Sequence, residues 1–263
     1  MAADAQRTAE LQQRLETLLR QQRDLVASLE GGQAHFRRLA RSVWRVQEDE
    51  RRRFARELHD GIGQNLTAVL RLLEHALQHP DVSPPLRREL ERARSVAHST
   101  LVEARALSRQ LRPQILDDLG LDAALRWLAR SFGESHELDV RLDLEQAPVL
   151  DGDAATLVFR VAQEGLTNIA KHAGANVARL SLRAVGGQAQ LRLSDDGRGC
   201  DMAQALRTGS EGQGSGLGGM RDRALVFGAQ LRVLSEPGAG FTLELEFPFA
   251  AKAGTLGAIT GPE

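Results

Sequence analysis

The sequence predicts three parts in series: an N-terminal coiled-coil helix, an α-helical hairpin that pairs with a second copy as a four-helix bundle, and an α/β sandwich. Apolar residues follow helical spacing up to about residue 112 and alternate along strands after Pro113. The hairpin also carries two apolar stripes that it cannot bury alone. We expect boundaries at 1–46 for the coiled coil, 47–112 for the hairpin, 117–249 for the sandwich and 250–263 for a disordered tail.

Composition excludes several other classes of protein. The 263 residues are 42% hydrophobic and 26% charged with a net charge of −1, which argues against a fibrous or disordered chain and against a generally basic nucleic-acid binder. One cysteine excludes an internal disulfide and a zinc site built from several cysteines, and favours a reducing, cytoplasmic setting. No apolar run approaches the ~20 residues of a membrane helix, so we expect no membrane segment in this chain.

The first part shows a heptad pattern. Leucines alternate at spacings of four and three, with Gln22 in one core position, which is typical of a short coiled-coil seam: Leu11, Leu15, Leu18, Leu25 and Leu29. Gly31-Gly32 is predicted to interrupt the helix, because paired glycines lower helix stability. Two interpretations stay open: a structural spacer, or a signalling helix that carries its register into the next part.

The second part is predicted as two antiparallel helices. An apolar stripe runs through residues 47–79, and breakers follow at 80–85. Ser83 is a suitable N-cap, with Pro84 in the first turn of the next helix. A second stripe follows at 86–111. Because two copies bury these stripes better than one, we expect a homodimer.

The third part alternates apolar and polar residues in about five strands. The strands centre on Leu142, Leu180, Leu191, Leu231 and Leu243, and Gly186-Gly187 predicts a hairpin between the second and third. Helical patterns lie at 121–132, 154–173 and 219–227. Helices on one face of a mostly antiparallel sheet make an α/β sandwich.

One group of polar residues lies in the predicted hairpin. His59 is one position off the apolar stripe, so we expect it at the solvent edge. Asp60 and Gln64 are four residues apart and share a helix face. A carboxylate beside an imidazole can accept its N–H and leave the other nitrogen free to attack an electrophile. Taken alone, a surface histidine beside an aspartate has no such role in most proteins.

A second group is rich in glycine. Asp195, Gly197 and Gly199 follow a strand, and 212–219 is a glycine-rich stretch before a helix, an arrangement that lets backbone N–H groups approach phosphates. An Asp at a strand end can accept a hydrogen bond from an adenine amino group. Upstream, Glu164 and Asn168 are four apart on one helix, with Lys171 and His172 just beyond. Carboxylate and amide oxygens suit Mg²⁺, and a lysine suits phosphate. The spacings match neither the P-loop nor the dinucleotide fingerprint.

In their order, these motifs resemble a bacterial two-component sensor histidine kinase, from the branch paired with LuxR-type response regulators. The resemblance covers about residues 47–247. Glu57-Leu58-His59-Asp60 with Gln64 resembles the phosphoacceptor box, and Gln163–Asn168 with Lys171-His172 resembles the N box. The later glycine motifs resemble the remaining nucleotide-binding boxes: Asp195, Gly197, Gly199, then Gly214, Gly216, Leu217, then Gly238, Gly240, Thr242.

The resemblance implies a Bergerat-type ATP-binding domain and a role for each residue. His59 would accept the γ-phosphoryl group of ATP, Asp60 would orient His59 or act as its base, and Gln64 would position water in a phosphatase reaction. Asn168 would coordinate Mg²⁺ with Glu164 nearby, and Asp195 would bind adenine. The phosphates and the rest of the nucleotide would be bound by Lys171, His172, Gly197, Gly199, Gly214, Gly216, Leu217 and Thr242. The implied partners are a second copy and a response regulator, with no direct contact to nucleic acid.

Two other functions stay open. The chain could be a phosphatase-dominant or kinase-dead switch in which nucleotide only sets conformation. It could also be an ATPase of the gyrase and Hsp90 type, for which Glu164, four residues before Asn168, has the spacing of a water-activating base. Both would share the fold, so activity assays separate them.

Overall fold

The computed structural model describes residues 2–201 and 216–249. The chain divides into two compact units, Met1–Arg45 and Val46–Glu263. The first unit lies within one helix, α1 (Ala2–Arg56). The predicted interruption at Gly31-Gly32 is wrong, because both glycines are helical. A cost of about 1 kcal/mol per glycine is small beside the many good helix formers of a 55-residue helix. The predicted seam residues Leu18, Leu25 and Leu29 are exposed in this single chain.

The second unit begins with the hairpin. The last turns of α1 continue through a π-helical segment, η1 (Glu57–Gly63), into α2 (Gln64–Gln78), and α3 (Pro84–Leu111) returns. Ser83 is the N-cap of α3, and its carbonyl accepts a 2.8 Å hydrogen bond from the Arg87 N–H. The predicted hairpin is confirmed, but the π-helical segment was not anticipated from sequence.

The hairpin buries one side of α3 and leaves other apolar side chains uncovered. Ala97, Leu101 and Ala104 are buried against the neighbouring helix. Leu72 and Val96 are 69% and 66% exposed. Leaving such large apolar side chains in contact with water is unfavourable in an isolated chain.

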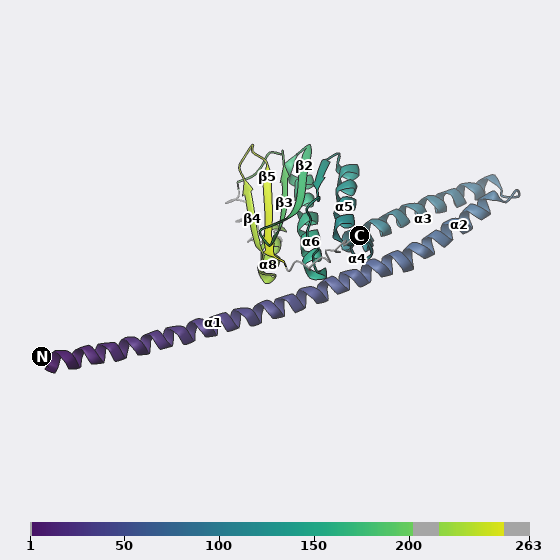
Figure 1. Cartoon of the computed structure of the whole chain (residues 1–263). Helices are drawn as coiled ribbons and strands as arrows, with labels where there is room; N and C mark the ends of the chain where they lie inside the picture. The colour runs from purple at the N-terminus through teal and green to yellow at the C-terminus, as the bar shows by residue number, and fades with distance from the viewer. Residues whose placement is uncertain (1, 202–215, 250–263) are drawn as a thin grey trace, which may run out of the picture. The chain divides into compact units, whose positions relative to one another are not determined.

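The rest of the second unit is a five-stranded sheet with helices on one face (Figure 1). The strands are β1 (Asp139–Asp143), β2 (Val177–Val185), β3 (Gln188–Asp195), β4 (Gln230–Ser235) and β5 (Phe241–Pro248), in the order β1-β2-β3-β5-β4. Only β1 and β2 pair in parallel. The helices are α4 (Gln114–Asp118), α5 (Gly120–His136), α6 (Gly152–Asn168) with its π-helical end η2 (Ile169–Ala173), and α8 (Gly216–Val226). The predicted α/β sandwich is confirmed, and α4 is an addition.

The sandwich core lies between α6 and the inner face of the sheet. Leu191, Leu193 and Leu243 are essentially fully buried there. Gly165 of α6 lies against Leu193 so closely that a Cβ at this position would collide with the leucine side chain. This close approach brings the C-terminal end of α6 to the end of β3, where the predicted nucleotide residues lie. Among the helices that the structure describes, none has the length and apolar character needed to cross a membrane.

Candidate functional site

A cavity of about 470 Å³ opens at the C-terminal end of α6. Its wall comes from α6 and η2, the segment after β3, the start of α8 and the start of β5. Several lining residues were predicted as nucleotide ligands: Asn168, His172, Asp195, Gly199, Gly216 and Leu217. The segment after β3 is tied to η2, because the Arg198 N–H donates to the Ala173 carbonyl at 2.9 Å and its side chain to the His172 carbonyl at 2.7 Å.

Asp195 is the buried carboxylate of this cavity. It is 8% exposed, and its Oδ1 accepts a 2.7 Å hydrogen bond from the Gly197 N–H. Its Oδ2 is buried and has no hydrogen-bond partner among the described residues. Burial raises the pKa of the Asp195 carboxyl above its ordinary value, and the bond from Gly197 opposes that effect. A buried acceptor without a donor is costly, so this oxygen is suited to a donor supplied by a ligand.

Three glycines shape the same region by the absence of side chains. A Cβ at Gly240, where φ is +75°, would run into the Asp195 backbone carbonyl, and one at Gly199 would run into the Glu236 carbonyl. A Cβ at Gly216 would occupy the position of the Glu164 carboxylate. Glu164 therefore lies at the start of α8, next to the cavity, rather than in its lining.

The remaining nucleotide predictions have different outcomes. Lys171 is exposed on η2 and does not line the cavity, although His172 beside it does. Thr242 pairs with Ser194 across β3 and β5, one residue after the lining residue Phe241. Gly214, in the glycine-rich stretch that the sequence analysis identified, lies outside the described residues.

His59 lies in η1 and lines a second, smaller cavity of about 160 Å³. It is exposed, as predicted. The two cavities share no lining residue. No hydrogen bond joins His59 to Asp60 or Gln64 within the described residues, so the expected pair with Asp60 is not formed in this state. Three arginines that the sequence did not indicate as site residues line the same cavity: Arg105, Arg109 and Arg112.

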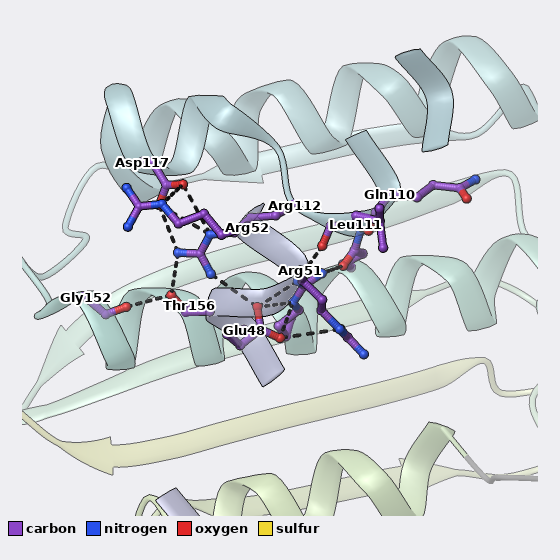
Figure 2. A network of polar contacts seen from close by, with 11 residues as sticks. Glu48, Arg51, Arg52, Gln110, Leu111, Arg112, Asp117, Gly152 and Thr156 are labelled. Atoms are coloured by element: carbon purple, nitrogen blue, oxygen red, sulfur yellow. Dashed lines mark hydrogen bonds and ion pairs between the residues drawn. The ribbon is translucent and has the colours of Figure 1, made fainter. Parts of the chain in front are cut away.

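A buried ion-pair network links the helix that leads into the hairpin to the α/β sandwich (Figure 2). Arg160 of α6 donates from Nη2 to Glu48 Oε2 at 2.7 Å and to the Leu111 carbonyl at 2.6 Å. Arg112 bridges Glu48 at 3.2 Å and Asp117 at 2.9 Å. Burial lowers the pKa of Arg160, against the raising effect of Glu48. In the sequence, the only sign that Arg160 is buried is its position as a single arginine inside the apolar run 157–162.

Two family models match the chain in the order of its two folded modules. Residues 50–116 match a model described as histidine kinase, and residues 152–251 match one described as histidine kinase-, DNA gyrase B-, and HSP90-like ATPase. The chain belongs to the histidine kinase family. The first match contains His59 and the second contains the cavity with Asp195, so the histidine kinase modules coincide with the two candidate sites.

Curated relatives carry the same family name. The sensor histidine kinase MctS of Rhizobium johnstonii is 35% identical over 83% of this chain and 47% of its own length. The oxygen sensor histidine kinase NreB of Staphylococcus carnosus is 33% identical over 81% of this chain and 60% of its own length. The chain thus spans about half the length of these histidine kinases. Among solved structures, the histidine kinase domain of a blue-light activated histidine kinase from Erythrobacter litoralis aligns over 71% of this chain and 94% of that one, with a TM-score of 0.44 and 22% identity.

Proposed function

We propose that this histidine kinase binds ATP in the cavity beside Asp195 and transfers its γ-phosphoryl group to His59. The observation that carries the proposal is the buried, unpartnered Oδ2 of Asp195 on the cavity wall. An adenine amino group would supply the missing donor. Because the hydrogen bond would favour the ionised carboxylate, nucleotide binding would offset the cost of burying that charge.

Other residues of the cavity fit the rest of a nucleotide. The start of α8, at Gly216 and Leu217, lines the cavity, and the positive potential of a helix N-terminus favours phosphate there. The amide oxygen of Asn168 would hold Mg²⁺ together with phosphate oxygens, with Glu164 nearby. The metal, when bound, would neutralise phosphate charge. Lys171, Gly197, Gly214 and Thr242 remain proposed contacts of the same nucleotide.

The phosphoryl step needs one nucleophile and one proton acceptor. A neutral His59 ring nitrogen forms the new N–P bond, the bond between the γ-phosphorus and the bridging oxygen breaks, and ADP leaves with that oxygen. The imidazolium then loses its remaining N–H proton, for which Asp60 is the proposed acceptor after a side-chain rotation. The carboxylate of a response regulator would next take the phosphoryl group from His59.

We assign 47–112 to a dimerising phosphoacceptor module and 117–249 to the ATP-binding module. The exposed apolar side chains of the hairpin, among them Leu72 and Val96, favour a homodimer that buries them in a four-helix bundle. The partner that receives the phosphoryl group would be a response regulator of the LuxR type, so any link to DNA runs through that protein. The single cysteine and the need for ATP favour the cytoplasm.

Removal of phosphate from the regulator is a second proposed activity. Gln64 is exposed at the start of α2, one turn after Asp60, where its amide can orient a water molecule toward a docked phospho-aspartate. Gln64→Ala should lower regulator dephosphorylation about tenfold or more, a usual effect of losing a positioning group. Unchanged dephosphorylation would remove Gln64 from this role.

Labelling with ATP that carries a tagged γ-phosphate tests the kinase proposal. The full chain should take up label that acid removes and alkali does not, as a phosphoramidate does. His59→Gln should abolish the label, whereas His98→Gln, an exposed change on α3, should retain it. Sustained ATP hydrolysis without labelled protein would instead favour the ATPase alternative.

A further inference from the structure

The cavity at His59 is lined in part by positively charged side chains, to which the proposed phosphoryl transfer from ATP assigns no role. It is lined by His59, by residues of α3, by the junction after α3 and by Trp127 of α5. Arg105 and Arg109 lie one turn apart on α3 and line it together. In the part of the chain that the structure describes, neither guanidinium is joined to an acceptor. Arg112, in contrast, is already paired with Glu48 and Asp117.

The backbone fixes these arginines beside the histidine. Ser108 lies between them in the sequence, is 4% exposed, and donates its hydroxyl to the Ala55 carbonyl at 2.8 Å. Ala55 lies four residues before His59. This bond holds α3 against the helix that carries His59, so the two free guanidinium groups stay near its imidazole.

The size and charge of the cavity suit one anionic group. The volume is about 160 Å³, and none of the lining residues is Asp or Glu. A phosphoryl group on a side chain carries roughly −1.5 to −2 charges near neutral pH and offers three acceptor oxygens. Two guanidinium groups neutralise such a charge and can each donate more than one hydrogen bond.

We propose that this cavity is a binding site for the phosphoryl group on His59, with Arg105 and Arg109 as its ligands. The inference rests on the proposed phosphorylation of His59 and extends it to the product state. Protonation of the other ring nitrogen accelerates hydrolysis of an N-phosphoryl imidazole, because the ring then leaves as neutral imidazole while water takes the phosphoryl group. Nearby cations disfavour that protonation, so the two arginines would prolong the life of the phosphorylated protein.

The test compares phosphorylated full-length variants after ATP has been removed. The variants are Arg105→Gln with Arg109→Gln, the same pair changed to Lys, and Arg94→Gln as a control on an exposed part of α3 outside the cavity. Two quantities are measured: the lifetime of phospho-His59 at neutral pH, and the pKa of its phosphoryl group by phosphorus NMR. The second readout responds to charge at the phosphoryl group rather than to general stability.

The double Gln variant should shorten the lifetime about tenfold and raise the phosphoryl pKa by about one unit, the usual scale for losing adjacent opposite charges. The Lys pair should restore most of the pKa shift, and Arg94→Gln should match the parent. If the parent is labelled on His59 while the double Gln variant keeps the parent lifetime and pKa, the cavity does not bind the phosphoryl group and the kinase proposal stands. If the parent is not labelled on His59, both proposals fail.

Discussion

Arg160 of α6 and Glu48 of α1 form a buried ion pair, with Nη2 and Oε2 2.7 Å apart and side chains 5% and 7% exposed. The pair joins two residues 112 positions apart in sequence. Glu48 belongs to the helix that leads to His59, whereas Arg160 belongs to the α/β sandwich, so the pair ties these two parts of the chain together. The neighbouring pair of Arg112 with Asp117 lies in the same network.

Removing one partner of this pair should be costly. Glu48→Gln leaves the Arg160 cation buried without its carboxylate, and we expect the free energy of unfolding to fall by about 3 kcal/mol. Glu48→Leu with Arg160→Met should recover much of that loss, because no uncompensated charge remains. Urea unfolding followed by circular dichroism measures both. Glu50→Gln, which breaks an exposed pair with Arg53, is the control and should cost less than about 1 kcal/mol. A Glu48→Gln loss no larger than the control's would contradict the account.

Removing the hydrogen bond between Ser108 and Ala55 should lower the free energy of unfolding by less than removing the ion pair does. Ser108→Ala removes a buried hydroxyl donor between α3 and α1 and should lower the free energy of unfolding by about 1 kcal/mol. Ser99→Ala is a matched control, since that exposed hydroxyl bonds only to the Val96 carbonyl of its own helix. Equal melting temperatures for the two variants would mean that Ser108 does not hold the helices together.

Asp195 should make the stability of the nucleotide-free protein depend on pH. Its folded-state pKa is raised above its ordinary value of 3.8, so its stabilising contribution is present below the unfolded pKa and is lost as pH rises through the folded pKa. Without nucleotide, Asp195→Asn should therefore be more stable than the parent at pH 7, by about 1 kcal/mol, and this gain should fade as pH falls through the raised pKa. Thermal unfolding between pH 4 and pH 7, in steps of roughly half a unit, measures the difference.

The same substitution should weaken nucleotide binding. In Asp195→Asn, the amide oxygen accepts from the Gly197 N–H, so its NH₂ group faces the adenine amino group and two donors oppose each other. Calorimetric titration with a non-hydrolysable ATP analogue should show an affinity loss of about tenfold to a hundredfold. Asp139→Asn, on β1 outside the cavity, should bind as the parent does. Equal affinities for the parent and Asp195→Asn would remove Asp195 from nucleotide binding.

Gly240 and Gly238 lie in the same turn. Replacing each with alanine distinguishes the cost of steric crowding from the cost of backbone strain. Both have positive φ, +75° and +84°, but a Cβ at Gly238 meets open space whereas one at Gly240 meets the Asp195 carbonyl. Gly238→Ala should cost only the strain of the left-handed region, about 1–2 kcal/mol. Gly240→Ala should cost clearly more and should also weaken ATP binding, because it displaces Asp195. Chemical unfolding and ATP-binding measurements on both variants test this. Equal losses in the free energy of unfolding would show that a Cβ at Gly240 is not crowded by the Asp195 carbonyl.

The sequence predicted most of the fold because apolar spacing is local. The alternation around Leu180, Leu191 and Leu243 located the strands, and the breakers at 80–85 located the hairpin turn. The short α4 and the two π-helical segments were missed, since such geometry is decided by tertiary packing rather than by composition. Both π-helical segments contain predicted site residues, His59 in η1 and Lys171 with His172 in η2.

Part of the site was also predictable, because some of its residues belong to motifs that are local in the sequence. Asp195, Asn168 and Gly216 belong to recognisable motifs, and the structure brings them to one cavity. The arginines of the His59 cavity were not found, because Arg105 and Arg109 lie about fifty residues from His59 and carry no motif of their own. The buried position of Arg160 likewise depends on Glu48, which local patterns do not connect to it.

Mapping the phosphorylated residue tests the central claim most directly. After incubation of the full chain with ATP and Mg²⁺, cleavage after Arg56 and Arg71 releases the peptide Glu57–Arg71, in which His59 is the only histidine. Mass spectrometry at neutral to alkaline pH should find one phosphoryl group on that peptide, fragmentation should place it on His59, and Asp195→Asn should lower its yield. A phosphoryl group on any other histidine, or an unmodified peptide in protein that hydrolyses ATP, would contradict the account.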